Sequence, residues 1–422
     1  MNLTVKQSRL SGEAAMPASK SHTIRGLIIG GLSDGECRLI QPLRSADTAA
    51  AVEAMRAFGA EITEEARDIV VAGAAGNVGA PAEPVDVGNS GTTLYIACVT
   101  AALAEGTVTL TGDEQIQARP VQPLVEAINS LGGRAQSIRR NGCAPVEITG
   151  PISGGTVEIE CPTSQYLTAL LINCPLAAGD THIEVPLLHE RPYVQMTLDW
   201  LDRAGIEYHN DGLTQFDIPG GQSYPAFERK IPADFSSATF FMAAAAITGS
   251  EVTLTGLDMN DPQGDRAVVD MLRKMGVEID IDGLRMVVRG GDLQGAELDL
   301  NATPDALPAM AAVACYADGE TLLGNVPQAR LKETDRIAVM AHELSKMGAD
   351  VRELDDGLVV RGSTLHGAPV NGHGDHRVVM ALAVAGLGCE GVTDIATAEA
   401  VNITVPNFVE LMSQLGASVH GA

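Results

Sequence analysis

Runs of apolar residues that follow a few small polar or charged residues recur six times along the chain. They are SKSHTIRGLIIGGL from Ser19, GNSGTTLYIACVTAAL from Gly88, PTSQYLTALLINCPL from Pro162, ADFSSATFFMAAAAI from Ala233, ATPDALPAMAAVACY from Ala302 and HGDHRVVMALAVAGL from His373. An apolar run rich in Ala, Leu and Met predicts a buried helix, and its polar lead is where an N-cap belongs. We therefore expect six buried helices.

A second pattern follows each of these runs and ends in a glycine. The segments are RAFGAEI, NSLGGRA, DRAGIEY, RKMGVEI, SKMGADV and SQLGASV, with glycines at Gly59, Gly132, Gly205, Gly276, Gly348 and Gly416, so that consecutive glycines are 68 to 73 residues apart. Each segment is typical of a helix closed by glycine and followed by a strand. Strands such as TVTLTG and EVTLTG precede these helices. The pattern predicts six repeats of about 70 residues, each a buried helix, a strand, an amphipathic helix and a strand.

Composition narrows the class of protein. A chain of 422 residues with 45% hydrophobic content is long enough for two domains or more. Its net charge of -26, from 54 acids and 28 bases, argues against binding to nucleic acid or to an anionic membrane surface. Seven scattered cysteines without a CxxC pair indicate reduced thiols and no zinc site. The longest uncharged apolar run, VVMALAVAGLGC, is too short to span a membrane, so we expect a soluble cytoplasmic protein.

The polar leads also suggest an anion site. If equivalent repeats pack in parallel, their helix N-termini point the same way, and their free N–H groups and partial positive charges add together. For any single lead, capping alone is the alternative explanation. Arg25 and Arg377 lie beside apolar runs, where a cation is costly unless it meets an anion. This placement favours a substrate that carries phosphate or carboxylate.

The segment RLKETDR, residues 330–336, places three cations and two acids together in this acidic chain. We expect it to continue as an amphipathic helix with a stripe of apolar residues at Ile337, Met340, Leu344 and Met347. On such a helix Lys332 and Arg336 share one face, and Glu333 can reach Arg336. A salt-bridged surface helix is one interpretation. A carboxylate held beside cations for proton transfer is the other.

Eight segments, in order along almost the whole chain, resemble one enzyme family. They are SKSHTIR, GNSGT, GDEQIQARPV, TSQYLTALL, RPYVQMTL, ADFSSATFFMAAAAI, RLKETDRI and GDHRVVMA. They are similar to motifs of the 5-enolpyruvylshikimate-3-phosphate synthases, enolpyruvyl transferases of the shikimate pathway that leads to chorismate and the aromatic amino acids. These enzymes transfer the enolpyruvyl group of phosphoenolpyruvate to the 5-hydroxyl of shikimate 3-phosphate.

The resemblance implies a fold and an assembly. It implies a two-domain inside-out α/β barrel of six repeats, three in each domain, with the active site in the cleft between them. An inserted domain would cover residues 16–233, and a discontinuous domain would cover residues 1–15 and 234–422. We expect a monomer with two small-molecule substrates, without a metal or an organic cofactor.

The resemblance also assigns site residues. Those expected to hold shikimate 3-phosphate are Lys20, Ser21, Arg25, Thr163, Ser164, Gln165, Tyr193, Asp305 and Lys332. Those expected to hold phosphoenolpyruvate are Lys20, Gly91, Arg119, Gln165, Arg336 and Arg377. As catalytic groups, Asp305 would help to deprotonate the attacking hydroxyl and Glu333 would protonate the methylene carbon. Lys20 would assist the proton transfers.

Three positions depart from the family pattern. Many members have a lysine where this chain has Ile403, an arginine where it has Tyr95, and a serine where it has Glu190. Two cations fewer and one acid more would weaken the binding of a dianion by about 1.5 to 3 kcal/mol for each lost charged hydrogen bond, unless other groups compensate.

These departures leave other functions open. A sister enolpyruvyl transferase acts on UDP-N-acetylglucosamine, but it has AKN where this chain has SKS, and a loop cysteine that GDEQIQARP lacks. An enolpyruvyl transferase acting on a different hydroxylated phosphate is a second alternative. A non-catalytic anion-binding paralogue is a third. Such a paralogue would be expected to have substitutions at the acid–base residues. The residues expected there are all present: Asp305, Lys332, Glu333, Arg336 and Arg377.

Overall fold

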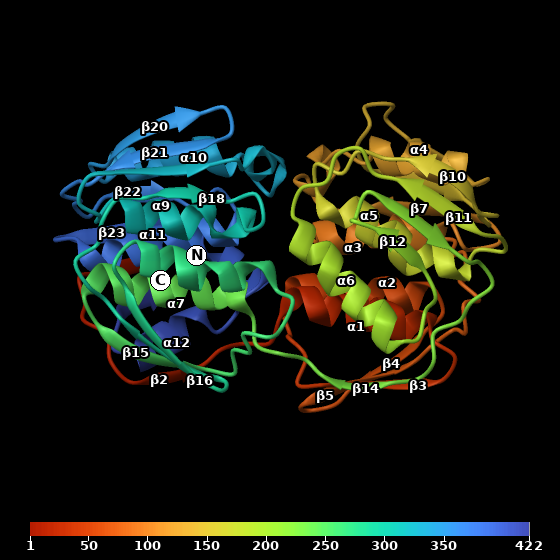
Figure 1. Cartoon of the computed structure of the whole chain (residues 1–422), viewed down its shortest axis with the longest axis horizontal. Coiled ribbons are helices and arrows are strands. Elements are labelled where there is room, and N and C mark those ends of the chain that lie inside the picture. Colours follow the sequence, from red (N-terminus) through yellow and green to blue (C-terminus); the bar gives the residue numbers. More distant parts are fainter. Residues whose placement is uncertain (422) are drawn as a thin grey trace. The chain divides into compact units, whose positions relative to one another are not determined.

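All six predicted buried helices are present in the computed structural model, which describes residues 1–421 (Figure 1). They are α1 (Lys20–Leu32), α3 (Gly91–Ala101), α5 (Ser164–Asn173), α7 (Phe235–Thr248), α9 (Leu307–Ala314) and α11 (His376–Gly388). Almost every residue of these helices is buried. The expectation from the apolar runs is confirmed.

The six amphipathic helices also end as predicted. They are α2 (Ala46–Ala57), α4 (Gln122–Ser130), α6 (Arg191–Arg203), α8 (Val268–Lys274), α10 (Arg336–Lys346) and α12 (Phe408–Gln414). The glycines that follow them all have positive φ angles, between 70° and 105°. Glycine adopts this left-handed conformation without the steric cost of a Cβ, so it can end the helix and start the next strand.

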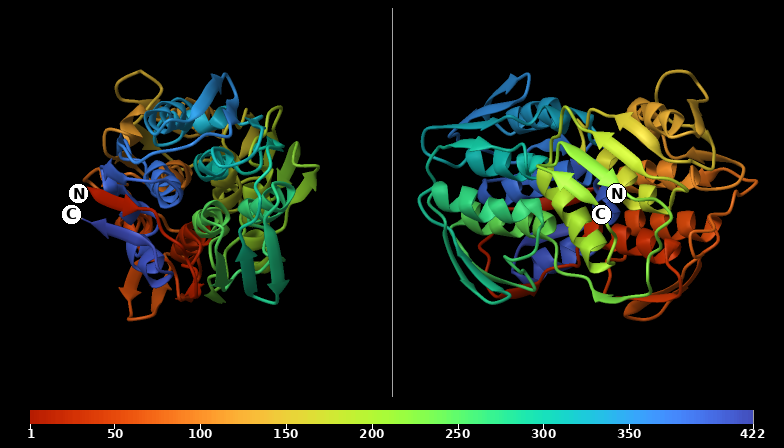
Figure 2. Two further views of the ribbon diagram at one scale, coloured as in Figure 1. Left: turned by 90° about the vertical axis from the view of Figure 1, so that its left-hand side faces the viewer. Right: turned by 45° about the vertical axis from the view of Figure 1, so that its right-hand side comes forward.

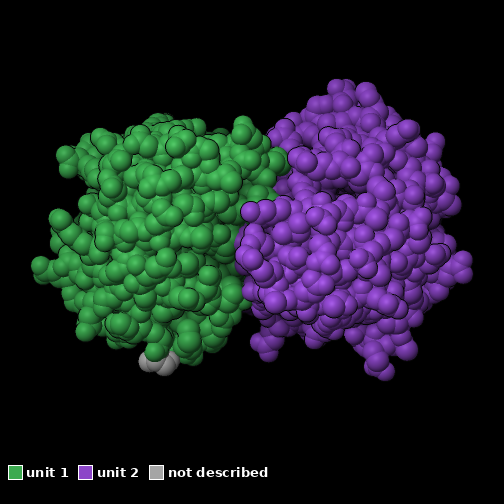
Figure 3. Space-filling model, turned by 90° about the horizontal axis from the view of Figure 1, so that it is seen from below, with its two compact units in different colours: residues 1–17, 232–422 green, residues 18–231 purple. Residues whose placement is uncertain are grey.

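The chain divides into two compact units, which Figure 3 shows in different colours. Unit 1 consists of Met1–Pro17 and Pro232–Ala422, and unit 2 is Ala18–Ile231. Each unit has its own cluster of buried apolar side chains. In unit 1, α7, α9 and α11 pack against one another, and the left view of Figure 2 shows these three helices end-on with strands around them.

Unit 2 contains three four-stranded sheets. Its strands are β3 (Glu36–Ile40), β4 (Glu61–Glu64), β5 (Asp68–Ala72), β6 (Val85–Asp86), β7 (Thr107–Thr111), β8 (Arg134–Ser137), β9 (Val146–Thr149), β10 (Gly155–Glu158), β11 (Thr181–Glu184), β12 (His209–Asp211), β13 (Gln215–Ile218) and β14 (Glu228–Lys230). Their orders are β14-β3-β5-β4, β6-β7-β9-β8 and β10-β11-β13-β12. The first two strands of each sheet are parallel and the others antiparallel.

Unit 1 repeats this arrangement. Its strands are β1 (Leu3–Lys6), β2 (Glu13–Ala15), β15 (Glu251–Thr255), β16 (Glu278–Asp282), β17 (Arg285–Arg289), β18 (Glu297–Asp299), β19 (Glu320–Gly324), β20 (Asp350–Leu354), β21 (Gly357–Arg361), β22 (Pro369–Asn371), β23 (Val392–Ala396) and β24 (Ser418–Gly421). Their orders are β16-β17-β15-β2, β18-β19-β21-β20 and β22-β23-β1-β24. The fold is therefore mixed α/β, with six sheets that match six sequence repeats.

Two strands from the N-terminal segment explain why unit 1 is discontinuous. β2 pairs in parallel with β15, although unit 2 lies between them in the sequence. β1 pairs antiparallel with both β23 and β24. In the other two sheets of unit 1, the equivalent inner position is held by β17 or β21, a strand from the same repeat. Unit 2 needs no such contribution, because β14 pairs with β3 of the same unit. Among residues 1–421, no helix is both long enough and apolar enough to span a bilayer.

Candidate active site

In unit 2, Arg25 is the central buried cation. Its side chain donates to Thr197 Oγ1 at 2.9 Å, Ser21 O at 3.0 Å, Tyr193 O at 3.0 Å and Thr168 Oγ1 at 3.3 Å. These acceptors lie on α1, α5 and α6, so the arginine joins three helices. All four are neutral oxygens. Burial lowers the pKa of Arg25 to about 10, and the nearby Tyr193 partly offsets this.

The N-terminus of α5 carries three of the expected phosphate-binding residues. Thr163 is the N-cap, and its hydroxyl accepts from Gln165 N at 3.5 Å and from Gln165 Nε2 at 3.2 Å. Ser164 is the first helical residue. The buried Glu190 carboxylate accepts from Ser164 and Thr163, so the acidic departure from the family pattern lies directly on this helix end.

Two further predicted residues of unit 2 lie at other helix N-termini. Lys20 opens α1, and its Nζ lies 3.1 Å from Oδ2 of the buried Asp47, the second residue of α2. Gly91 opens α3 against the side chain of Arg119. A Cβ built on Gly91 would lie 1.9 Å from Arg119 Nη1, so only glycine leaves space for this guanidinium.

In unit 1, Arg336 binds three carboxylates. It donates to Asp375 Oδ2 at 2.8 Å and Oδ1 at 3.2 Å, to Asp305 Oδ1 at 2.7 Å and to Glu333 Oε2 at 2.5 Å. Arg377 lies 2.9 Å from the other oxygen of Asp305. Burial lowers the pKa of Arg336, but Asp375, Glu333 and Asp305 outweigh burial and hold it above the ordinary value. The structure thus joins four residues that the sequence had assigned to one site.

Asp375 is a member of this network that the sequence analysis missed. It is the N-cap of α11, fully buried, and it accepts from Arg377 N at 2.9 Å and Thr334 Oγ1 at 3.1 Å as well as from Arg336. An acid between glycine and two basic residues in GDHR was the available signal. Across residues 1–421, no group of three or more His, Cys, Asp and Glu side chains is arranged to hold a metal ion.

The prediction that RLKETDR is part of the amphipathic helix is wrong for residues 330–335. A short 3-10 helix covers Pro327–Leu331, and α10 begins only at Arg336, because the Asp335 side chain caps it by accepting from Ala338 N at 3.0 Å. Lys332 and Glu333 lie in the connection, so Lys332 does not share a helix face with Arg336. The contact of Glu333 with Arg336 is present. The apolar stripe from Ile337 to Met347 is buried as expected.

Two of the departures lie against apolar cores. Tyr95 is 3% exposed, and its ring packs edge-on against Tyr166 of α5, with centroids 5.0 Å apart. Ile403 ends a 3-10 helix (Ala398–Ile403) and packs against the core of unit 1. Both side chains are therefore explained by packing within their own units.

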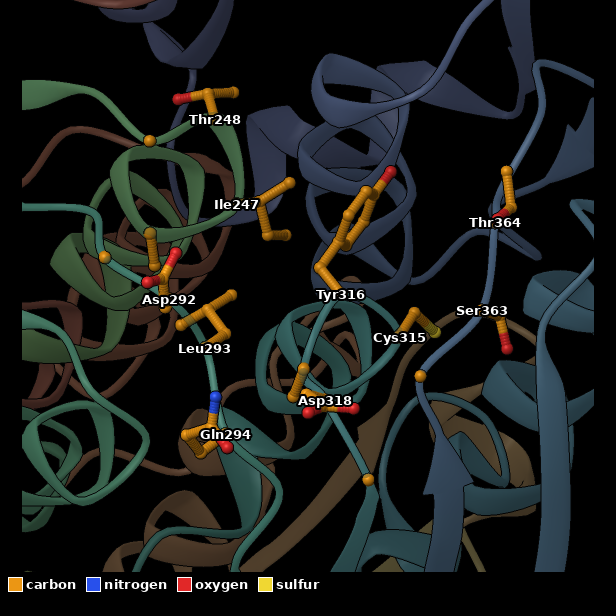
Figure 4. Close-up of a pocket in the computed structure, with 16 residues that line it drawn as sticks. Ile247, Thr248, Asp292, Leu293, Gln294, Cys315, Tyr316, Asp318, Ser363 and Thr364 are labelled. Atoms are coloured by element: carbon orange, nitrogen blue, oxygen red, sulfur yellow. The ribbon is translucent and has the colours of Figure 1, made fainter.

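The cavity in Figure 4 is a different feature. It belongs to unit 1, has a volume of about 800 Å³ and is lined by residues that include Ile247, Tyr316 and Asp318. These residues lie at or just after the C-terminal ends of α7 and α9. Helix C-termini carry partial negative charge and do not attract anions. The predicted residues cluster at the N-terminal ends of helices, so this cavity is not the candidate active site.

The fold and these residues define a mixed α/β enzyme for small anionic substrates, in which buried arginines meet helix N-termini and carboxylates. A family model described as EPSP synthase (3-phosphoshikimate 1-carboxyvinyltransferase) matches residues 4–412. The chain belongs to the EPSP synthase family.

Several curated relatives named 3-phosphoshikimate 1-carboxyvinyltransferase match over nearly their whole length. The protein of Ruminiclostridium cellulolyticum is 53% identical and that of Acetivibrio thermocellus 52% identical, in each case over 99% of both chains. The protein of Halobacterium salinarum is 44% identical over 100% of both chains. The solved EPSP synthase of Acinetobacter baumannii has a TM-score of 0.82 at 26% identity, covering 99% of each chain. This chain is therefore similar to these enzymes in both sequence and fold.

Proposed function

We propose that this protein is a 3-phosphoshikimate 1-carboxyvinyltransferase. It transfers the enolpyruvyl group of phosphoenolpyruvate to the 5-hydroxyl of shikimate 3-phosphate and releases phosphate, within the shikimate pathway. The protein works in the cytoplasm as a monomer, and its two units form the two domains of an inside-out α/β barrel.

The observation that carries this proposal is the environment of Arg25. A buried cation with neutral acceptors is costly, because desolvation is offset only by dipoles. A phosphate brought to the N-termini of α1 and α5 would supply the counter-charge. Ser21, Thr163, Ser164 and Gln165 supply hydroxyl and amide groups beside it, and Tyr193 lies on α6 beside the same arginine. This set suits the phosphate of shikimate 3-phosphate.

Phosphoenolpyruvate carries two anionic groups, and four cations and one amide side chain suit them. The groups proposed to bind it are Lys20, Arg119 and Gln165 in unit 2 and Arg336 and Arg377 in unit 1. The fork of an arginine pairs well with a carboxylate or a phosphate. Gly91 contributes by leaving space for Arg119.

The ion pairs of Arg336 suggest how proton transfer is controlled. Glu333 and Asp305 are both bound to this arginine, a condition that favours their ionised forms. When an anionic group of phosphoenolpyruvate takes over the arginine donors, these carboxylates lose a counter-ion and gain affinity for a proton. Binding of the substrate thus prepares Glu333 as the general acid.

The reaction then proceeds by addition and elimination. Asp305, with Lys332 beside the substrate hydroxyls, helps to remove the proton of the attacking 5-hydroxyl. Glu333 delivers a proton to the methylene carbon of phosphoenolpyruvate as the new carbon–oxygen bond forms, giving a tetrahedral intermediate. Loss of phosphate and of one methyl proton restores the double bond, and Lys20 assists these proton transfers.

The test is phosphate release from phosphoenolpyruvate by the purified protein. We expect release with shikimate 3-phosphate as acceptor, and none with shikimate or UDP-N-acetylglucosamine. We expect Glu333→Gln to lower turnover by about 100-fold or more while shikimate 3-phosphate still binds, as for loss of a general acid. Release with another acceptor alone would replace the proposed substrate, and normal turnover of Glu333→Gln would remove Glu333 from the mechanism.

A further inference from the structure

The carboxylate of Glu190 lies on the N-terminus of α5. Its Oε2 accepts from Ser164 Oγ at 2.8 Å, from Ser164 N at 3.0 Å and from Thr163 Oγ1 at 3.2 Å. The residue is 2% exposed. One buried anionic oxygen therefore occupies three donors at a helix N-terminus. These are donors that an incoming phosphate oxygen would use.

The N-cap residue of α5 is not the source of this carboxylate. Thr163 already caps α5, as Ser19 and Ser90 cap α1 and α3 with their hydroxyls. Glu190 comes instead from the start of a different helix, α6, where it is the N-cap residue but makes no capping bond with its own side chain. Its carboxylate thus adds a full negative charge to a helix end whose own cap is neutral.

The backbone of Glu190 is held in an uncommon conformation. Its φ and ψ angles are 56° and 37°, in the left-handed region that residues with a Cβ rarely adopt. Such a conformation persists where surrounding contacts hold it. The bonds to Thr163 and Ser164 are among the contacts that hold it here. A ligand that takes over these donors would remove all three of these bonds from the Glu190 carboxylate.

We propose that Glu190 is a specificity-determining residue that competes with the acceptor substrate for the N-terminus of α5. Its carboxylate holds the donors of Thr163 and Ser164 while the site is empty and leaves them when phosphate binds. A phosphate dianion offers more charge than the carboxylate and displaces it. A neutral hydroxyl cannot, so unphosphorylated acceptors are rejected. This inference rests on the proposed function, since it takes shikimate 3-phosphate as the ligand.

Binding of shikimate 3-phosphate and of inorganic phosphate to Glu190→Gln tests the competition. Gln keeps the length and one acceptor oxygen but removes the charge. We expect its Kd for both ligands to be about 10-fold lower than that of the wild type, because a charged hydrogen bond no longer has to be broken. Glu207→Gln removes an exposed acid from the same unit and serves as the matched control, with a Kd within about twofold of the wild type. An unchanged or higher Kd for Glu190→Gln would overturn the competition.

A double-mutant cycle identifies the shared donor. Ser164→Ala removes the hydroxyl that Glu190 and phosphate both require, and we expect it to reduce phosphate affinity more in the Glu190→Gln background than in the wild type. Equal losses would mean that phosphate does not use this donor. If Glu190→Gln disturbs folding, the same measurements are made on Glu190→Asn, because asparagine tolerates the left-handed backbone conformation.

Two measurements separate this inference from the proposed function. If the wild type releases no phosphate with shikimate 3-phosphate but Glu190→Gln still binds inorganic phosphate more tightly, the substrate is wrong and the competition stands. If the wild type turns over normally and Glu190→Gln binds both ligands no better, the function stands and the competition is wrong.

Discussion

Arg25 and Arg336 are both buried, but their surroundings give them opposite properties. Arg25 has neutral oxygens around it and a lowered pKa, whereas Arg336 has three carboxylates and a raised pKa. At the residue scale, unit 2 therefore holds a cation suited to an added anion. In unit 1, an anion that bound Arg336 would have to replace one of its carboxylates.

The close contact of Gly91 with Arg119 gives a prediction at this scale. In Gly91→Ala, the new Cβ would overlap Arg119 Nη1 and push the guanidinium away from the N-terminus of α3. We expect the KM for phosphoenolpyruvate to rise by about 10-fold or more, as for one lost charged hydrogen bond, while the Kd for shikimate 3-phosphate changes little. Steady-state kinetics and a binding titration measure the two.

Gly30→Ala is the matched control, because its Cβ would meet Cys37 at an ordinary contact distance of 3.4 Å in the last turn of α1. A similar rise in KM for both variants would show that the effect of Gly91→Ala does not come from Arg119.

The sequence allowed part of the candidate site to be predicted, for identifiable reasons. Glu333 reaches Arg336 because they are only three residues apart, and the glycine after each amphipathic helix has the backbone angles that its position requires. Asp375 and Glu190 were not predicted as partners because each meets residues distant in the sequence. The start of α10 was misplaced because Asp335, rather than the earlier charged residues, caps it.

At the element scale, the connection between β22 and α11 is fixed by a buried acid on α10. The Glu343 side chain is fully buried and accepts from Asn371 N at 2.9 Å, Lys346 Nζ at 2.8 Å and His373 Nε2 at 2.8 Å. His373 has a φ of 54°, so this connection needs contacts to hold it. It leads directly to Asp375 and Arg377. Glu343 thus holds the segment that immediately precedes Asp375 of the Arg336 network.

This arrangement predicts a pH-dependent stability. Burial raises the pKa of Glu343, but the donors of Lys346, His373 and Asn371 outweigh it, and the pKa lies below its ordinary value of 4.5. The ionised form therefore stabilises the fold above pH 4.5, and this contribution is lost as the pH falls through the lowered pKa. We expect Glu343→Gln to reduce the free energy of unfolding by about 2 kcal/mol at pH 7, and by less at pH 3.

Urea unfolding at the two pH values measures this difference. Glu278→Gln, at an exposed strand position of the same unit, is the control and should have little effect at either pH. A loss of stability for Glu343→Gln that is equal at pH 7 and pH 3 would contradict the assignment.

At the scale of the whole molecule, the two units differ in how their sheets are completed. The sheets of unit 2 use strands from residues 36–230 alone, whereas unit 1 needs β1 and β2 from the N-terminal segment. The six repeats were predictable because glycine and apolar runs recur locally. The placement of β1 between β23 and β24 was not, since β1 pairs with strands at the other end of the sequence.

We therefore predict different outcomes for two truncated proteins. A fragment of residues 18–231 has every strand of its sheets and its own apolar core, so we expect a single cooperative thermal transition by circular dichroism. A chain that lacks residues 1–6 loses a central strand of unit 1, and we expect that unit to lose its cooperative transition. Cooperative unfolding of unit 1 without β1 would contradict this account of the sheet.

The position of β1 also bears on how such a gene is organised. Leu3 lies opposite Gly421 in the antiparallel pair of β1 and β24, and the Met1 amino group bonds to Glu399 at 2.8 Å. Because the two ends of the chain are neighbouring strands, a short turn between them would make an ordinary hairpin. A circularly permuted gene that joined these ends and opened at the border of unit 2 would encode unit 1 as one uninterrupted segment.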